Sequence, residues 1–221
     1  MKNILIYGAS GHAKVIADIL IENKEHNIIG FLDSFKPVNQ DIYGFKILGN
    51  LDCLPDLIKE YNISGIIIGI GDNFIRKNAY SKISKIAPNL EFITAIHPNA
   101  IIAQDVVVSE GTVIMPGTII NVHAKIGRFC ILNTKSSLDH DSEMSDFSSL
   151  APSVNVSGNV KIGECSSICL AASIIQNVSI GKYTVVGAGS LVLKSIGDYK
   201  QAFGSPISTL KDRKADALYL G

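Results

Sequence analysis

The sequence of 221 residues has no excess charge of either sign. Lys plus Arg and Asp plus Glu number 20 each, so the formal net charge is zero. Nucleic acids and anionic membranes attract strongly basic surfaces, because their phosphates are negatively charged. The balanced charge therefore argues against either as the main partner, and it puts no net repulsion between copies of the chain.

Long hydrophobic runs and paired cysteines are also missing. No window approaches the roughly 20 apolar residues of a transmembrane helix, and the apolar run after Met1 is too short for a secretory signal. We therefore expect a cytoplasmic protein without a membrane partner. The cysteines show no paired metal-ligand spacing, so we expect them to be reduced and mostly structural; they are Cys53, Cys130, Cys165 and Cys169.

Residues 1–95 alternate between strand and helix patterns. Short apolar runs alternate with segments of helical periodicity; the runs are NILIY, NIIGFLD and SGIIIGIGDN. The first and third runs end in Gly-rich turns. This order predicts an α/β domain with a small parallel sheet of about three strands covered by helices, similar to half of a dinucleotide-binding fold.

A different period begins near residue 96. Steps of six from Ile126 in both directions give 17 positions from Ile96 to Val192, and all are aliphatic or Met. The position four residues after each is small or β-branched, and the next residue after the apolar one is often Gly, which would ease a turn. A period of six indicates a β-helix with about 18 residues per triangular coil, whereas a β-sandwich would show period two. We expect this β-helix over residues 96–193 and a capping tail over 194–221.

The segment GASGHAKV, Gly8 to Val15, lies at the first strand-to-helix turn of the N-terminal domain. Glycines let a ligand approach the backbone, and the N-terminus of the following helix favours an anion. The spacing departs from G-x-G-x-x-G, so a mononucleotide diphosphate fits better than NAD. Asp33 ends the second strand, where an acidic residue can meet a ribose, and GIGDN ends the third. A tight turn without any ligand is the alternative.

The segment SSLDHDSEMSDF, residues 136–147, places His140 between Asp139 and Asp141. Leu138 and Met144 keep the apolar column, so the β-helix continues through this polar segment and His140 lies outward at a turn. Histidine can accept a proton near neutral pH, and a neighbouring carboxylate can fix its tautomer. His123 lies 17 residues earlier, but a third histidine is missing nearby, and catalytic zinc usually takes three protein ligands. We therefore expect no bound metal.

Together these segments resemble the sialic acid O-acetyltransferase-like family of bacterial sugar acetyltransferases, in its nucleotide-linked 4-amino-sugar N-acetyltransferase branch. The resemblance covers essentially the whole chain and rests on IYGASGHAKVIADIL, HPNAIIA, NTKSSLDHD, VSGNVKIG and VSIGKYTVVGAGSLVLKSI. It implies a left-handed parallel β-helix, a homotrimer with active sites between subunits, acetyl-CoA as donor, and a nucleotide sugar held by the N-terminal domain.

The resemblance also implies roles for single residues. His140 would be the general base, oriented by Asp141 or by Asp139. The nucleotide sugar would contact Gly8, Ser10, Gly11, His12, Asp33 and Gly71. The alternative for His12 is a surface histidine without a ligand. Acetyl-CoA would contact Asn133, Gly158, Gly187 and Ala188. Family members often have a second histidine about nine residues after the base, where this chain has Ser149, so the contact to the thioester stays open.

We therefore expect an acetyl-CoA-dependent N-acetyltransferase for bacterial glycan biosynthesis. Its acceptor would be the 4-amino group of a nucleotide-linked 4-amino-4,6-dideoxy or trideoxy sugar, with UDP as the favoured nucleotide. Such an amine is mostly ammonium at neutral pH and must lose a proton before it attacks a thioester, which is the task of a histidine base. The alternatives are O-acetylation of sialic acid or a related sugar hydroxyl, and a non-enzymatic assembly scaffold.

Overall fold

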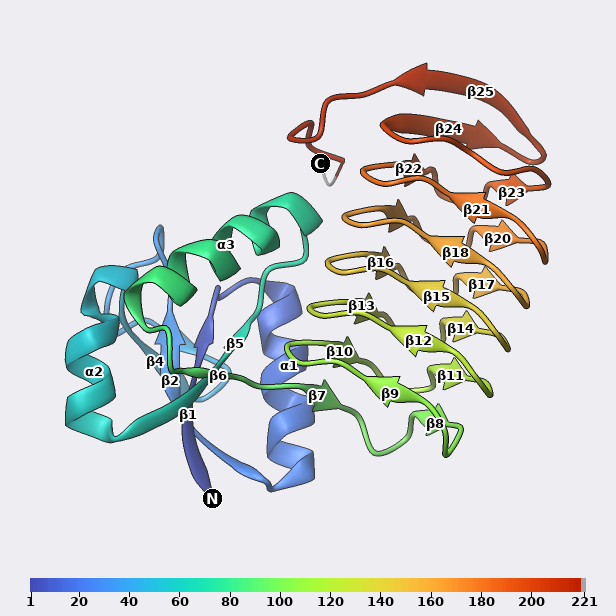
Figure 1. Cartoon of the computed structure of the whole chain (residues 1–221). Helices are drawn as coiled ribbons and strands as arrows, with labels where there is room; N and C mark the ends of the chain where they lie inside the picture. The colour runs from blue at the N-terminus through green and yellow to red at the C-terminus, as the bar shows by residue number, and fades with distance from the viewer. Residues whose placement is uncertain (220–221) are drawn as a thin grey trace. The chain divides into compact units, whose positions relative to one another are not determined.

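The computed structural model describes residues 1–219, which divide into two compact units (Figure 1). Unit 1 comprises Met1–Gly71 and Ile75–Pro98, and unit 2 comprises Asp72–Phe74 and the chain from Asn99 onward. The division after Pro98 lies close to residue 96, where the period of the sequence changes.

Unit 1 contains a sheet with the strand order β3-β4-β2-β1-β5-β6. Neighbouring strands are parallel from β4 to β6 in this order, and β3 pairs antiparallel with β4. The central strands are fully buried at Ile4, Leu5 and Ile66, as expected for a parallel sheet with both faces covered. The strands are β1 Lys2–Tyr7, β2 His26–Leu32, β3 Asp41–Ile42, β4 Phe45–Gly49, β5 Ile63–Ile68 and β6 Glu91–Phe92.

The helices of the chain are α1 Gly11–Asn23, η1 Leu51–Cys53, α2 Leu54–Tyr61 and α3 Asn73–Ile86. The segments of helical periodicity between and after the apolar runs form α1, α2 and α3, with Pro55 in the first turn of α2. The prediction of about three strands was too low, because it missed β3, β4 and β6. These strands are two, five and two residues long, too short for periodicity to separate them from loops. Within residues 1–219, no helix is long and apolar enough to span a membrane.

Residues 95–192 form 17 strands of two residues each, and the predicted parallel β-helix is confirmed. In every case the second residue of the strand is the apolar residue of the six-residue column. The strands are β7 Ala95–Ile96, β8 Ile101–Ile102, β9 Val107–Val108, β10 Val113–Ile114, β11 Ile119–Ile120, β12 Lys125–Ile126, β13 Ile131–Leu132, β14 Ser137–Leu138, β15 Glu143–Met144, β16 Ser149–Leu150, β17 Asn155–Val156, β18 Lys161–Ile162, β19 Ser167–Ile168, β20 Ser173–Ile174, β21 Ser179–Ile180, β22 Val185–Val186 and β23 Leu191–Val192.

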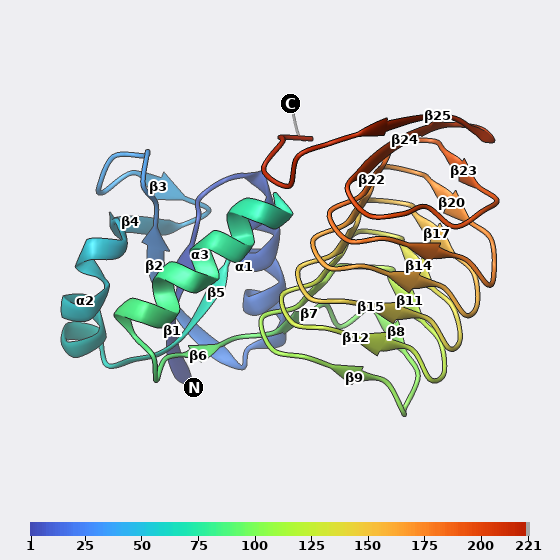
Figure 2. The ribbon, with the colours of Figure 1, turned by 45° about the horizontal axis from the view of Figure 1, so that its top comes forward.

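Each coil of the β-helix contributes one strand to each of three parallel sheets (Figures 1 and 2). The first sheet contains β10, β13, β16, β19 and β22; the second runs from β8 through β11, β14, β17 and β20 to β23; the third contains β9, β12, β15, β18 and β21. Residues 18 apart pair between coils, as Ile120 does with Leu138. We call the turns between the first and second sheets, such as residues 133–136, the 1–2 edge. The turns between the second and third, such as residues 139–142, are the 2–3 edge.

Small hydroxyl side chains fill the interior corners of the coils, as the second column predicts. Thr112, Ser142 and Ser166 are completely buried. The Ser142 hydroxyl donates to the carbonyl of Ser157 at 3.0 Å, and the Ser166 hydroxyl donates to that of Gly181 at 2.5 Å. These bonds satisfy carbonyls that face the interior at a turn, which apolar side chains of the same size could not do.

Glycines after the apolar column have a different role from the one predicted. The left-handed backbone falls two residues later, at positions such as Asp141, with φ 57°. A β-carbon on Gly163 would lie 2.5 Å from the backbone nitrogen of Lys182 in the next coil. Gly163 is therefore required by the close approach of the next coil, not by a left-handed φ.

The last coil is covered by a hairpin of β24 Lys200–Gly204 and β25 Ile207–Asp212. Strand β24 pairs parallel with β22 and so extends the first sheet of the β-helix. The hairpin lies within the predicted capping tail.

Candidate active site

His140 lies on the 2–3 edge, in the turn between β14 and β15. Leu138 and Met144 on either side of this turn are buried in the interior of the β-helix. The imidazole points outward, with the side chain 55% exposed, as the sequence predicts. The base candidate is thus exposed on a turn whose two ends are anchored in a rigid core.

Asp141 contacts the imidazole directly. Its Oδ2 atom lies 2.8 Å from Nδ1 of His140. This hydrogen bond, together with the negative charges of Asp139 and Asp141, raises the pKa of His140 above its ordinary value, against the opposing effect of desolvation. With Nδ1 occupied as a donor to the carboxylate, Nε2 is left as the proton acceptor of the neutral ring.

Asp139 contacts the backbone of the turn, not the ring. Its Oδ1 atom accepts the backbone N–H of His140 at 2.8 Å and the side-chain amide of Asn121 at 2.6 Å. The hydrogen bond from Asn121, followed by that from the His140 backbone, lowers the pKa of Asp139. The structure thus gives the two aspartates different contacts, whereas the sequence left either of them as the possible partner of the ring.

Gly158 lies under the imidazole. A β-carbon at this position would come within 2.5 Å of the Cε1 and Nε2 atoms of His140. Gly158 belongs to the next coil on the same edge. The next residue, Asn159, donates its backbone N–H to the carbonyl of His140 at 2.8 Å. The predicted acetyl-CoA residue Gly158 is therefore brought together with the predicted base.

A groove of about 470 Å³ follows the outer face of the second sheet and reaches the 2–3 edge. Asn121, Asp139, Ser157 and Gln176 line it at this edge. Asp139 and Ser157 directly precede His140 and Gly158 in the sequence, so two lining residues of the groove are the immediate neighbours of the base candidate and of the glycine beneath its ring.

The other predicted acetyl-CoA residues lie on the 1–2 edge, across the second sheet from His140. Asn133 accepts the backbone N–H of Thr134 at 2.8 Å, and Ala188 is exposed. Gly187 is buried, and a β-carbon there would come 2.3 Å from the ring of Phe203. Within one chain, the structure does not bring these three residues to His140.

The predicted nucleotide-sugar residues of unit 1 gather at the carboxyl ends of parallel strands. Gly8 has φ 100° and follows β1, Asp33 follows β2, and Gly71 follows β5. The Asp33 carboxylate accepts the backbone N–H of Ala9 at 2.9 Å, which joins the first two of these loops. Its other oxygen accepts the backbone N–H groups of residues 35 and 36. Asp33 therefore braces the loops themselves.

Ser10 and Gly11 open the α1 helix, where backbone N–H groups are exposed. Ser10 is the N-cap residue, but its hydroxyl makes no capping hydrogen bond. Space around the α-carbon of Gly11 is open within 4 Å. This N-terminus leaves room for an anionic group, as the sequence predicts.

His12 lies in the first turn of α1, with a buried Nε2 that has no hydrogen-bond partner. Burial, with a smaller contribution from the positive charge of Arg76, lowers its pKa from 6.5 to about 3. Arg76 itself donates to the carbonyls of Ile70 and Gly71, at 3.0 and 2.8 Å. His12 is therefore neutral near pH 7 and is not the solvated surface histidine that the sequence left as an alternative.

Comparison with known proteins adds to this geometry. The family model for the PglD N-terminal domain matches residues 3–83. The perosamine N-acetyltransferase of Caulobacter crescentus, solved as a histidine mutant in complex with CoA and GDP-perosamine, is 30% identical. The match covers 96% of this chain and 97% of that one, with a TM-score of 0.89. This chain belongs to the PglD family of sugar N-acetyltransferases.

Other PglD-family relatives agree with the motif resemblance, which is confirmed. The UDP-N-acetylbacillosamine N-acetyltransferase of Bacillus subtilis (strain 168) is 36% identical over 121 residues. That match spans only about half of either protein, 52% of each. The acetyltransferase domain of PglB from Neisseria gonorrhoeae FA1090, in complex with acetyl coenzyme A, is 25% identical. It covers 94% of this chain and 98% of that chain, with a TM-score of 0.85.

Asn121 is the residue at this PglD-family site that the sequence reading missed. It stands 18 residues before Asp139, and residues 18 apart pair throughout the β-helix. The coil length of 18 residues could therefore have placed Asn121 beside Asp139, although the residues next to Asn121 in the sequence give no indication of a site.

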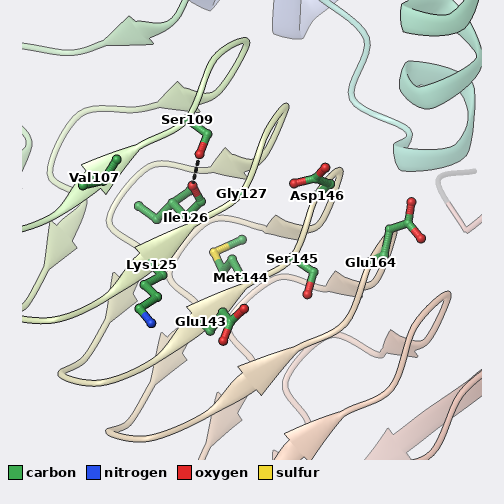
Figure 3. Close-up of a pocket in the computed structure, with 10 residues that line it drawn as sticks. All are labelled: Val107, Ser109, Lys125, Ile126, Gly127, Glu143, Met144, Ser145, Asp146 and Glu164. Carbon is green, nitrogen blue, oxygen red and sulfur yellow. Dashed lines mark hydrogen bonds between the residues drawn. The ribbon is translucent and has the colours of Figure 1, made fainter.

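A larger groove, of about 520 Å³, lies on the third sheet and contains none of the predicted residues (Figure 3). Lys125 and Glu143 project from its neighbouring strands β12 and β15, and Asp146 lies at the next turn. Asp146 is used within the fold, since it accepts the backbone N–H of Arg128 at 2.8 Å. We therefore place the candidate site at the groove of the second sheet.

Metal ligands do not cluster in the part of the chain that the structure describes, where no group of three or more His, Cys, Asp or Glu could hold an ion. His123, one coil before His140, pairs with Asp105, whose Oδ2 lies 2.8 Å from its Nδ1. All four cysteines are free thiols.

Proposed function

We propose that this protein transfers the acetyl group of acetyl-CoA to the 4-amino group of a nucleotide-linked 4-amino-4,6-dideoxy or trideoxy sugar. The observation that carries this proposal is the hydrogen-bonded pair of His140 and Asp141, whose sequence neighbour Asp139 lines a groove on the β-helix. Two relatives are named for N-acetylation of such sugars, one linked to UDP and one to GDP. The Bacillus relative, with higher identity over its shorter match, supports UDP as the first nucleotide to test.

His140 acts as the general base in this proposal. Asp141 accepts the Nδ1 hydrogen, so Nε2 keeps its lone pair and faces away from the carboxylate. Nε2 accepts a proton from the sugar ammonium, and the freed amine nitrogen attacks the carbonyl carbon of the thioester. The C–N bond forms and the C–S bond breaks; of the two protons that the nitrogen loses overall, one passes to the leaving sulfur and the other to solvent. The products are the N-acetyl sugar and the CoA thiol, without a covalent enzyme intermediate.

The nucleotide sugar would be anchored by unit 1. The open N-terminus of α1, formed by Ser10 and Gly11, offers backbone N–H groups to a diphosphate. The loop braced by Asp33 stands beside it through the bond to Ala9. His12 would face this region as a neutral group, so any contact it makes with the ligand would be as a hydrogen-bonding ring and not as a cation.

We also propose that the working form is a homotrimer. Three of the four residues inferred to hold acetyl-CoA, Asn133, Gly187 and Ala188, lie on the 1–2 edge, whereas Gly158 and His140 lie on the 2–3 edge. A complete site then needs the 1–2 edge of a second subunit to face His140. Large apolar side chains are exposed on the early coils, including Ile101, Val107 and Val122, and such surfaces favour association.

The test is an acetyl-transfer assay on the full chain. Release of the CoA thiol is measured with UDP-, GDP- and dTDP-linked 4-amino sugars and with free sialic acid as acceptors. We expect transfer to a nucleotide-linked amino sugar, and a loss of at least about a hundredfold in kcat for His140→Ala. His123→Ala removes the comparable exposed histidine one coil earlier and should retain activity.

Two results would contradict the proposal. Activity on sialic acid alone would favour O-acetylation over N-acetylation. A loss of less than about tenfold for His140→Ala would remove this residue from the role of general base. Mass measurement in solution tests the trimer separately, since a monomer at assay concentration would leave His140 without a second subunit.

A further inference from the structure

The turn that carries His140 is held by a side chain from the preceding coil. We propose that Asp139 and Asn121 form a positioning pair that fixes the backbone of this turn, and hence the direction of the imidazole, while Asp141 alone holds the ring. This inference rests on the proposed function of His140 as the base. It gives the two aspartates different tasks and adds Asn121 to the site.

One oxygen atom joins the three groups. Oδ1 of Asp139 accepts the side-chain amide of Asn121 at 2.6 Å and the backbone N–H of His140 at 2.8 Å. Asn121 is itself fixed, because its backbone N–H donates to the carbonyl of Leu138 at 3.0 Å. The Asp139 carboxylate is therefore tied to a residue whose own backbone is part of the hydrogen-bonded coil.

The imidazole depends on this backbone for its direction. Its side chain is 55% exposed, Nδ1 is hydrogen-bonded to Asp141, and Cε1 and Nε2 occupy the space that a β-carbon on residue 158 would need. Asp141 adopts the left-handed φ of 57°, which Asp tolerates better than most residues but which depends on the surrounding turn. A turn released at Asp139 would move both the ring and its carboxylate partner, and misplacement by about 1 Å can cost a hundredfold in rate.

Asp139 also brings a charge to the turn. The charged groups that act on His140 are Asp139 and Asp141 on its own turn; on the preceding coil, His123 is paired with Asp105. In the following coil, the facing residues 157–159 are Ser, Gly and Asn and carry no charge. The negative charge of Asp139 helps to raise the pKa of His140. Its acceptor oxygen and its charge can therefore be removed separately.

A purely stabilising hydrogen bond between coils is the competing explanation. Such bonds occur elsewhere on this edge, for example between the side chains of Asn159 and Asn177 at 2.8 Å. A purely stabilising bond would change the melting temperature but not the pH dependence of kcat. The two explanations thus predict different results for the same variants.

The variants are Asp139→Asn, Asp139→Ala and Asn121→Ala in the full chain. Asp139→Asn keeps an acceptor oxygen for both bonds and removes the charge, so kcat at high pH should be largely retained. Without that charge the pKa of His140 falls, and the acid limb of the kcat profile moves to lower pH. Asp139→Ala removes the acceptor, and kcat should fall at least about tenfold with little change in KM for acetyl-CoA.

A double-mutant cycle tests whether the two residues act as a unit. Asn121→Ala should lower kcat in the same direction as Asp139→Ala, and the double variant should lose no more than Asp139→Ala alone. Additive losses would overturn the pair. Equal losses for Asp139→Asn and Asp139→Ala, with no shift of the acid limb, would overturn the separation of acceptor and charge.

Asp105→Ala is the matched control. Asp105 accepts the backbone N–H of His123 at 2.6 Å and also lies 2.8 Å from Nδ1 of its ring, so it holds the comparable exposed histidine one coil earlier on the same edge. This variant should leave both kcat and its pH profile unchanged. A loss equal to that of Asp139→Ala would show a general effect of the edge and would contradict the proposal.

An activity-independent measurement keeps this inference separate from the proposed function. The imidazole resonances of His140 are followed by NMR from pH 5 to 9 in the wild type, Asp139→Asn and Asn121→Ala. A lower midpoint for Asp139→Asn and altered ring shifts for Asn121→Ala support the pair even if no acceptor sugar is found. Unchanged titration and shifts in both variants would overturn it, whatever the substrate.

Discussion

The imidazole of His140 lies over the α-carbon of Gly158, so closely that a β-carbon there would come within 2.5 Å of Cε1 and Nε2. Residue 158 does not have a left-handed φ, so alanine is compatible with its backbone. The three atoms nearest to such a β-carbon all belong to the ring of the proposed base, so a side chain at this position would meet the ring first.

Gly158→Ala should displace the imidazole while the β-helix stays folded. We expect kcat to fall by about tenfold to a hundredfold, because the ring must rotate away from its seat, with little change in melting temperature. Gly197→Ala is the control, since the space around that α-carbon is open within 4 Å. Equal activity of the two variants would show that the position of the ring over Gly158 is not needed for turnover.

Asp141→Asn should damage the base through its tautomer. An asparagine amide at this place can donate to Nδ1, and the ring would then carry its hydrogen on Nε2, where it cannot accept a proton. Removing the carboxylate also lowers the pKa of His140, since the hydrogen bond to Asp141 is the main cause of its rise. We expect kcat to fall at least about tenfold and NMR to show the Nε2–H tautomer; a retained Nδ1–H tautomer would contradict this role.

His12 should make unit 1 sensitive to acid. Its pKa is about 3 in the folded chain against 6.5 as the ordinary value, so protonation favours the unfolded chain. The free energy of unfolding should therefore decrease as the pH falls through the range between these two values. His12→Leu should reduce the slope of stability against pH in this range by up to one proton, measured by urea denaturation at several pH values. Equal slopes for wild type and variant would show that the ring is hydrated in solution.

Two buried serines of the same column should respond in opposite ways to alanine. The Ser166 hydroxyl donates to Gly181 at 2.5 Å and accepts the backbone N–H of Thr184 at 2.9 Å. Ser136 is equally buried, but its hydroxyl has no partner. Ser166→Ala leaves two backbone groups unsatisfied and should cost about 1–3 kcal/mol, whereas Ser136→Ala should be neutral or stabilising. Chemical denaturation of both variants measures the difference, and equal losses would contradict it.

The β-helix could be predicted residue by residue because its coils repeat one local rule. Each hexapeptide places one apolar residue inward, so an error at one position is corrected by sixteen others. Strand β6 of unit 1 follows no such rule: it is formed by Glu91 and Phe92 alone and exists because β5 offers it a parallel partner. Pairing of this kind is decided by tertiary contacts, which the local sequence does not display.

The site could be predicted as residue types but not as contacts. Asp139 and Asp141 are both next to His140, and the sequence offers no reason to prefer either as the ring partner. The left-handed φ of Asp141 places its carboxylate at Nδ1, whereas Asp139 turns toward Asn121. Gly187 shows the same limit, because only the fold reveals that Phe203 covers it.

Because neighbouring coils pair at an offset of 18 residues, the residues that position His140 lie far from it in the sequence. The turn of His140 rests on Val122, whose carbonyl accepts the N–H of Asp141 at 3.1 Å, and on Gly158. Both positions are one full coil away in the sequence. Relatives that differ in acceptor sugar could therefore share the segment SSLDHDSEMSDF and still differ in the reach and basicity of their histidine. Those differences should be sought one coil before it and one coil after it.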